Sequence, residues 1–273
     1  LFMRGRQGSA AGDYAKHVPT RVISTMLGIA ERDQEQFRTW IHQVTNEGVT
    51  DFEVFKRAIA EVDAFFTAEI EARRGALRQD LISHLLRQAI DGKPLSLEHM
   101  LGTLRLLLFA GIDTTWSAIG LSLHHLARTP EHRRRLVGDP GLMPSAIEEF
   151  LRVYAPVSVA RLVAKDKEVG GCPFQAGQMV LLPYPAANRD PEKFDNPDQV
   201  ILDREENRHA TFGLGIHRCV GSNLARMELT IAIEEWLRRI PEFELDETEE
   251  IAWSPGLVRG PRRLPVRFAA PAH

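Results

Sequence analysis

The chain has 273 residues, with 34 Lys and Arg against 37 Asp and Glu, which gives a formal net charge of −3. This length supports one large domain or two modest ones with a substantial core. The nearly balanced charge argues against a nucleic-acid-binding surface, which is normally basic. The two cysteines, Cys172 and Cys219, do not make a disulfide framework, so we expect a cytoplasmic protein in a reducing compartment.

Neither a membrane span nor a signal peptide is predicted. The longest apolar run, Leu106–Ile112, is far shorter than the roughly 20 residues that cross a bilayer. The first residues, Leu1–Arg6, lack the apolar segment of a secretory signal. Because the first residue is not Met, we expect a fragment or a domain taken from a longer protein.

Apolar periodicity predicts helices through most of the first two thirds of the chain and again near its end. These helices are predicted over residues 21–29, 31–44, 51–74, 80–90, 97–128, 144–154 and 220–239. The segment 97–128 stands out, because Ser96 is a good N-cap and Thr129-Pro130 ends the helix. At 1.5 Å per residue it would be about 48 Å long, so it is expected to cross the whole domain.

The pattern changes after Pro156. Residues 157–163 and 178–182 read as strands, with a hairpin signal at Val169–Cys172. Residues 187–208 form a long polar stretch with little periodicity, and 255–268 contains short strand-like pieces. The predicted fold class is therefore mainly α with small β-sheets.

The segment Phe212–Gly221 surrounds the single thiol of Cys219 with three glycines and one aromatic ring. Glycines allow unusual dihedrals and a close approach of the backbone to a ligand. We expect Cys219 at the start of a helix, where the helix N-terminus favours a thiolate and hence a metal ligand. A buried structural cysteine is one alternative. A zinc site with His217 is another, although structural zinc takes four ligands and Cys172 is isolated.

Two further motifs are candidates for function. Ala110–Thr115 lies in the middle of the long helix, where Gly111 and two threonines weaken the helix and would open a local groove. There Asp113 beside Thr114 would make a proton relay, the alternative being a solvated face. Glu149 and Arg152 are spaced i, i+3 and can pair on one helix face, although an ordinary surface pair has the same spacing.

The three motifs, in this order, resemble those of the cytochromes P450, the haem-thiolate monooxygenases, and most closely those of the bacterial soluble class. The resemblance implies a haem b cofactor with Cys219 as the iron ligand. It places Phe212, Gly213 and Gly221 around the haem and gives His217 and Arg161 the haem propionates. Asp113 and Thr114 become the acid–alcohol pair that delivers protons for oxygen activation, and Glu149 with Arg152 becomes a structural pair tied to the polar stretch. The residues that would line the substrate pocket are Phe109, Ala110, Val157, Val159, Leu257 and Val258.

The resemblance runs from Asp13 to Phe268 and implies a single haem domain over residues 1–273, formed by the C-terminal two thirds of the family fold. The N-terminal third of that fold is absent from this sequence. Residues 269–273 could begin a linker, because the segments 9–17 and 101–120 look most like members fused to a reductase.

The implied activity is insertion of one oxygen atom of O2 into a small organic substrate. Electrons would come from NAD(P)H through a flavin and iron–sulfur reductase or a ferredoxin, in trans or fused C-terminally, which would dock near Cys219 and Arg218. No nucleic acid or membrane partner is expected. Two alternatives stay open, namely a peroxide-driven haem enzyme and a non-catalytic haem-binding protein.

Overall fold

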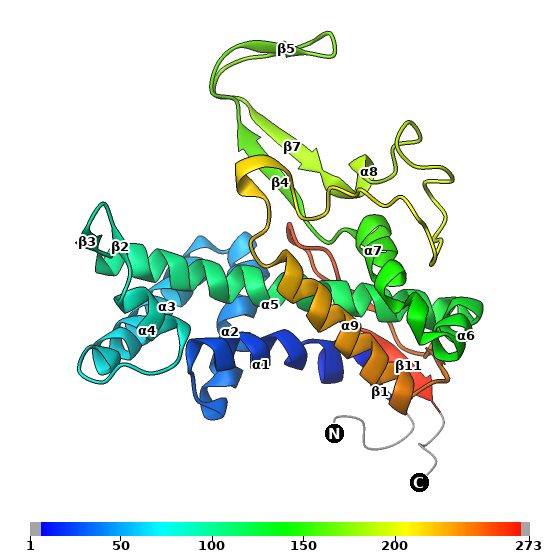
Figure 1. Cartoon of the computed structure of the whole chain (residues 1–273), viewed down its shortest axis with the longest axis horizontal. Coiled ribbons are helices and arrows are strands. Elements are labelled where there is room, and N and C mark those ends of the chain that lie inside the picture. The colour runs from blue at the N-terminus through cyan, green and yellow to red at the C-terminus, as the bar shows by residue number, and fades with distance from the viewer. Residues whose placement is uncertain (1–6, 269–273) are drawn as a thin grey trace.

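The computed structural model describes residues 7–268, so the linker expected at 269–273 lies outside the described residues. The fold is mainly helical, as predicted (Figure 1). Its helices are α1 (His17–Leu27), α2 (Gln34–Thr45), α3 (Phe52–Arg74), α4 (Leu81–Leu86), α5 (Leu97–Arg128), α6 (Pro130–Gly138), α7 (Met143–Tyr154), α8 (Tyr184–Ala187) and α9 (Ser222–Arg239). Short turns of other helix types include η1 (Ala10–Ala15) and η5 (Gly215–His217).

The strands form small antiparallel sheets. One sheet has the order β1 (Gln7–Ser9), β11 (Pro265–Phe268) and β8 (Phe243–Leu245), so it joins the two ends of the described chain. The other strands form two-stranded ribbons, which are β2 (Ala89–Ile90) with β3 (Lys93–Pro94), β4 (Ser158–Leu162) with β7 (Met179–Pro183), β5 (Lys167–Val169) with β6 (Cys172–Phe174), and β9 (Ala252–Trp253) with β10 (Pro261–Arg263). The β4–β7 and β5–β6 ribbons stand away from the helices in Figure 1.

Helix α5 runs through the molecule and contributes to two separate hydrophobic cores (Figure 1). Its first half packs Leu104, Leu108 and Ile112 against α1, α2, α3 and α4. Its second half packs Ile119 and Leu123 against α7, α9 and the β1–β11–β8 sheet. The middle of α5 therefore lies where the two cores meet.

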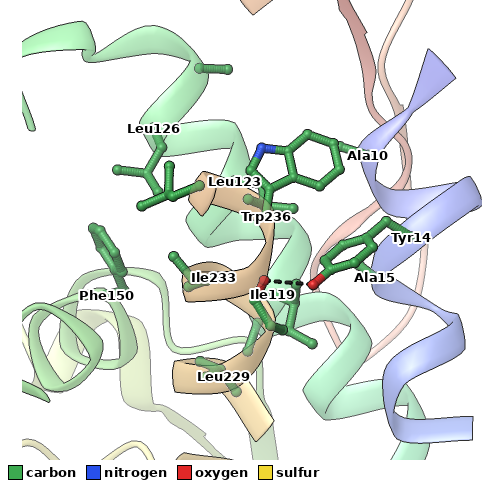
Figure 2. Packing of buried hydrophobic residues seen from close by; sticks show 14 of the residues in the cluster. Ala10, Tyr14, Ala15, Ile119, Leu123, Leu126, Phe150, Leu229, Ile233 and Trp236 are labelled. Carbon is green, nitrogen blue, oxygen red and sulfur yellow. Dashed lines mark hydrogen bonds between the residues drawn. The ribbon is translucent and has the colours of Figure 1, made fainter. Parts of the chain in front are cut away.

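Aromatic side chains organise the second core, which Figure 2 shows from close by. The Trp236 ring lies between Tyr14 and Phe243, with centroid distances of 5.1 and 5.4 Å. The Tyr14 hydroxyl donates a 2.6 Å hydrogen bond to the carbonyl of Ala232 in α9. These contacts fasten η1, near the start of the chain, to α9, near its end.

By length and composition alone, α5 could cross a membrane, with a mean hydropathy of 1.5 over its most apolar window. In the folded chain, 61% of that window is buried. The two cores account for this apolar character, because each half of α5 is covered by other elements of the same chain.

An arginine buried in the first core ties the end of α1 to α3 and α4. Arg73 donates a 2.7 Å bond to Asp80 and further bonds to the carbonyls of Leu27 and Gly28. Gly28 has φ of 68°, and a Cβ there would lie 2.3 Å from Oδ2 of Asp80. Only glycine therefore fits this corner.

Four sequence predictions were wrong in detail. The helix predicted over 21–29 spans His17–Leu27, because Gly28, in the left-handed region, ends it. The helix predicted over 80–90 ends at Leu86, because Asp91 and Gly92, with φ of 50° and 74°, form the tight turn between β2 and β3. Helix α6, which starts at Pro130, was not predicted, although proline is favoured in the first turn of a helix. Helix α9 begins at Ser222 rather than at residue 220.

Candidate functional site

The loop from Phe212 to Gly221 is held by backbone hydrogen bonds. The Cys219 amide donates to the Phe212 carbonyl at 2.8 Å, which closes the loop at its base. Gly213 and Gly215 both have φ of 69°, a conformation that favours glycine. Because α9 starts at Ser222 with Gly221 as its N-cap, the prediction that Cys219 begins the helix was wrong. The thiol lies in the loop just before α9.

The thiol and the large apolar side chains around it are exposed. Cys219 is exposed, and the exposed fractions of Leu214, Ile216 and Val220 are 76%, 97% and 95%. Apolar side chains that gather on a surface usually mark a binding site. This loop therefore offers one sulfur ligand within an apolar surface, which is the donor set that a flat, apolar, metal-bearing group such as haem requires.

Arg226, on the first turns of α9, lies against this loop. Its guanidinium stacks on the Phe212 ring at 4.6 Å and donates two hydrogen bonds, of 2.6 and 2.8 Å, to Glu148 of α7. The bonds to Glu148 raise the pKa of Arg226. Burial opposes ionisation of Glu148, but the bonds from Arg226 and His209 prevail and lower its pKa to about 2. A permanent cation therefore sits beside the loop.

The structure brings Glu149 and Arg152 into direct contact and buries both completely. Two hydrogen bonds of 2.8 Å join them on α7. Glu149 also accepts hydrogen bonds from Arg204 at 3.0 Å and from the amide of Ile201 at 2.9 Å. Burial opposes ionisation of Glu149, yet these donors outweigh it and lower its pKa.

The same arginine holds the irregular stretch that follows α8. Arg152 donates to the carbonyls of Asn188, Pro197 and Gln199 at 2.7–2.8 Å. Asn188 in turn donates to Thr211 at 2.8 Å and accepts from the amide of Ala210 at 2.7 Å. Residues 210 and 211 directly precede Phe212, so the Glu149–Arg152 pair is linked to the base of the cysteine loop.

The middle of α5 presents a face that is exposed at Leu106 and Ala110 and partly exposed at Thr114. Leu106, Ala110 and Thr114 follow one another at a spacing of four residues, and Leu106 is 65% exposed. The Thr114 hydroxyl donates to the Ala110 carbonyl at 2.7 Å. The expected local opening of the helix is not present, because α5 is continuous from Leu97 to Arg128. Gly111 instead allows close packing of α1, since a Cβ there would lie 2.6 Å from Cδ1 of Ile23.

Asp113 occupies the opposite, buried side of the same turn and is 1% exposed. Its Oδ1 lies 2.7 Å from a guanidinium nitrogen of Arg262, on β10. Burial raises the pKa of Asp113, and the Arg262 guanidinium partly opposes this shift. Asp113 and Thr114 are therefore adjacent in sequence but have different partners in the structure.

The residues predicted to line a pocket come from three segments, and the fold brings two of these segments together. Val157 forms an isolated bridge with Val258, and the Ser158 amide donates to the Leu257 carbonyl at 3.3 Å. Val159 lies on β4, and Phe109 and Ala110 lie on α5. The loop that contains Val258 is itself pressed against α5, because a Cβ at Gly260 would lie 2.5 Å from Cβ of Ser117.

The two candidate propionate ligands are accessible. Arg161 lies on β4 with its guanidinium donating to the Ala160 carbonyl at 2.9 Å, and His217 lies in η5. Both side chains are exposed, so both are available to an anionic group.

Sequence reasoning missed Glu148, Arg204, Arg226 and Arg262. Arg226 follows Cys219 by seven positions on a predicted helix, and Glu148 precedes the Glu149–Arg152 motif, so both could have been suspected. Arg204 lies in the irregular stretch before the cysteine loop, and Arg262 lies on the short strand β10. Neither residue belongs to a local sequence pattern that indicates its partner.

Comparison with known proteins places these features in one family. The cytochrome P450 family model matches residues 20–139 and 141–265. The chain is 35% identical to a probable cytochrome P450 127A1 from Sinorhizobium fredii over 86% of this chain and 56% of the relative. It is 34% identical to the mycinamicin IV hydroxylase/epoxidase of Micromonospora griseorubida over 96% of this chain and 67% of that enzyme. The solved structure of the Bacillus subtilis cytochrome P450 PksS superposes with a TM-score of 0.92 at 32% identity, covering 97% of this chain and 69% of that one. The chain thus spans about half to two thirds of the length of these curated relatives.

Replacing Arg152 by alanine is expected to destabilise the fold. The variant leaves the buried Glu149 carboxylate with fewer donors and frees three carbonyls, and breaking a buried pair costs about 3–5 kcal/mol of unfolding free energy. Denaturant unfolding of the wild type and the variant measures this difference. Arg238→Ala is the matched control, because Arg238 forms an exposed pair with Glu235 at the same i, i+3 spacing. Equal effects of the two substitutions would contradict the buried network as a source of stability.

A second prediction concerns Glu228 of α9, which is 4% exposed and whose Oε2 has no hydrogen-bond partner among the described residues. Burial raises its pKa from 4.5 to about 7.

The folded state therefore keeps a proton on Glu228 that the unfolded state releases, so the free energy of unfolding falls as pH rises from 4.5 through 7. Glu228→Gln should remove this loss, which is on the order of 3 kcal/mol. Unfolding free energies at pH 4.5 and 8 test this, with Glu234→Gln on the exposed side of α9 as the control. If Glu228→Gln and the wild type lose equal stability over this range, Glu228 is not the group responsible.

Proposed function

Because the chain belongs to the cytochrome P450 family, we propose that it forms the catalytic part of a haem-thiolate monooxygenase. The reaction is insertion of one oxygen atom of O2 into a small organic substrate. The observation that carries this proposal is the exposed Cys219 thiol, which lies among exposed apolar side chains in a loop closed by a backbone hydrogen bond.

The described residues fit a haem b group. Cys219 supplies the iron ligand, while Phe212, Gly213 and Gly221 shape the loop around it. The exposed side chains of Leu214, Ile216 and Val220 supply apolar contact for the macrocycle. His217 and Arg161 are the proposed partners of the propionates. When bound through a thiolate, haem supplies the oxygen-activating chemistry, because the ligand pushes electron density onto the iron.

The face of α5 that carries Ala110 and Thr114 is the proposed opposite wall of the site. There the Thr114 hydroxyl holds a proton at its Oγ and can exchange its present acceptor, the Ala110 carbonyl, for a bound ligand. Asp113 is the proposed acid that replaces that proton. Phe109, Ala110 and the paired segments at Val157, Val159, Leu257 and Val258 would orient the substrate and exclude water.

The names of two relatives support hydroxylation as the reaction type. They are the mycinamicin IV hydroxylase/epoxidase and a methyl-branched lipid omega-hydroxylase. We propose NAD(P)H as the electron source, through a ferredoxin or a flavin and iron–sulfur reductase that docks near Cys219 and Arg218. A single haem domain over residues 1–273 and a cytoplasmic location complete the proposal.

Cys219→Ala is expected to abolish the Soret band that is diagnostic of thiolate ligation in the reduced, CO-bound protein. The reason is that alanine offers no ligand to the iron. Difference spectra of the purified full-length protein measure this loss. Cys172→Ala is the matched control, because Cys172 is also exposed but lies on the distant β5–β6 ribbon. Retention of the band without Cys219 would refute the proposed ligand.

Thr114→Ala is expected to lower the yield of product per NAD(P)H consumed, since a positioned proton donor contributes on the order of 100-fold. The measurement is the ratio of product to NAD(P)H, together with the peroxide released. Thr103→Ala is the matched control, because Thr103 is a partly exposed threonine of α5, like Thr114, and also bonds back to the carbonyl four residues earlier, at 2.9 Å. Full coupling in Thr114→Ala would exclude this hydroxyl from proton delivery.

A further inference from the structure

Hydrogen bonds join three side chains in series, one each from α6, α5 and α7. Nδ1 of His125 lies 2.7 Å from the Tyr154 hydroxyl, and Nε2 of His125 lies 2.8 Å from Nδ1 of His132. His125 is 8% exposed and packs on the Phe150 ring at a centroid distance of 5.3 Å. His132 is half-buried and so can exchange protons with water. We call His132, His125 and Tyr154 the histidine–tyrosine triad.

The available partners fix the direction of these hydrogen bonds when the triad is uncharged. The Tyr154 hydroxyl has no other acceptor among the described residues, so it donates to Nδ1 of His125. A neutral imidazole that accepts at Nδ1 carries its proton on Nε2. Nε2 of His125 therefore donates to Nδ1 of His132, which carries its own proton on Nε2.

One added proton cannot be accommodated without reversing these bonds. His132 can take the proton only on Nδ1, because its other nitrogen is already protonated. Two N–H donors would then face each other across the 2.8 Å contact with His125. This conflict ends when the proton of His125 is on Nδ1 instead of Nε2, so that Nδ1 donates to the tyrosine oxygen. The Tyr154 hydroxyl thereby loses its acceptor.

Charged and titratable groups act on the triad from several elements around it, namely Glu131 and Arg135 on α6, His124 and Arg128 on α5, and Arg189 and Asp203 in irregular segments. Glu131 and Asp203 favour protonation of the histidines, whereas Arg135 and His124 oppose it. Arg128 and Arg189 act on Tyr154, where burial prevails and raises the pKa of the phenol.

Burial is the largest influence on both histidines of the triad. It lowers the pKa of His125 to about 4 and lowers the pKa of His132 below 6.5. The unfolded chain therefore binds protons at a higher pH than the folded triad does. The stabilisation from the triad is complete above pH 6.5 and is lost as pH falls from 6.5 toward 4.

Tyr154 is the last residue of α7, so its position sets the start of the segment that follows. The Pro156 carbonyl accepts a 2.6 Å hydrogen bond from the amide of Arg259, and Val157 forms a bridge with Val258. These backbone contacts join two segments of the proposed pocket wall. A tyrosine that is held by a hydrogen bond at the end of α7 therefore steadies both segments.

We propose that His125 and Tyr154 are positioning residues for this wall and that His132 makes their hydrogen bond sensitive to pH. When His132 gains one proton from water, His125 reverses its hydrogen bonds, Tyr154 is released and both segments loosen. The triad gains a single proton in this step, and no electrons move. The identity of the two segments as a pocket wall rests on the proposed function, whereas the pH response of the triad does not.

The test compares His132→Asn and Tyr154→Phe with the wild type as full-length, haem-containing proteins. Asparagine at 132 keeps an oxygen acceptor near the position of Nδ1 but does not gain a charge. Phenylalanine at 154 removes the hydroxyl and so resembles the released state at every pH. His99→Asn is the matched control, because His99 is an exposed histidine of α5 outside the triad.

Two measurements between pH 7.5 and pH 4.5 report the response. Hydrogen exchange of peptides covering residues 154–163 and 255–262, corrected for the intrinsic effect of pH, reports loosening of the two segments. Nuclear magnetic resonance of labelled histidine rings in the reduced, CO-bound protein reports which nitrogen of His125 carries the proton.

In the wild type, exchange of both peptides is expected to rise roughly fivefold at the lower pH, which corresponds to the loss of one hydrogen bond. The proton of His125 should move from Nε2 to Nδ1 over the same range. His132→Asn should abolish both changes and His99→Asn should keep them. Tyr154→Phe should show the faster exchange at both ends of the range.

A wild type without this rise, or a His132→Asn protein with the full rise, would overturn the inference. If His132→Asn does not fold, an unchanged pH response of exchange in Tyr154→Phe overturns it equally. Neither measurement depends on catalysis, and the Cys219→Ala spectrum tests the haem-thiolate site separately, so the two proposals can fail independently.

Discussion

The shared use of α5 by two hydrophobic cores is the constraint on which the rest of the structure depends. Each half of the helix is fixed by a different set of neighbours, so its central turn cannot shift without disturbing both cores. Asp113 and Thr114 lie on that turn, one toward the interior and one toward the partly exposed face. A rigid helix would support the proton-delivering role proposed for these two residues better than a loop, because its side chains are held within narrow limits.

Helix α7 fixes the position of the cysteine loop, as the two cores fix the position of the middle of α5. Its adjacent carboxylates face different partners, since Glu148 holds Arg226 under Phe212, and Glu149 with Arg152 holds the irregular stretch before the loop. Burying these charges is expensive, and a buried pair often adds less stability than an apolar core would. The buried charges therefore serve mainly to hold residues 188–214, which have no helix or strand, in a single conformation.

The sequence predicted the long helix to its exact bounds, because apolar periodicity, the Ser96 cap and Pro130 all act locally. The glycines around Cys219 also predicted a loop there, although α9 starts at Ser222, two residues after the predicted start. The partners of the site residues were less accessible. Arg204 bonds Glu149 across 55 positions, and nothing in the sequence around Arg204 indicates this contact. Arg262 is a similar case, because its position against Asp113 follows from how β10 packs on α5, which is a property of the tertiary structure.

The close contact between Gly260 and Ser117 has a consequence for how this protein can change. Leu257 and Val258 lie a few residues before it, in a loop whose backbone is anchored to α5 at a point where no side chain fits. Gly120 and Pro261 make a second such contact, since a Cβ at Gly120 would lie 2.9 Å from Cγ of Pro261. Substitutions at Leu257 and Val258 can therefore change the side chains of the loop while these two backbone contacts with α5 are kept. At the proposed pocket positions 257 and 258, selection for new substrates would be expected to accumulate changes, while 117, 120 and 260 stay as they are.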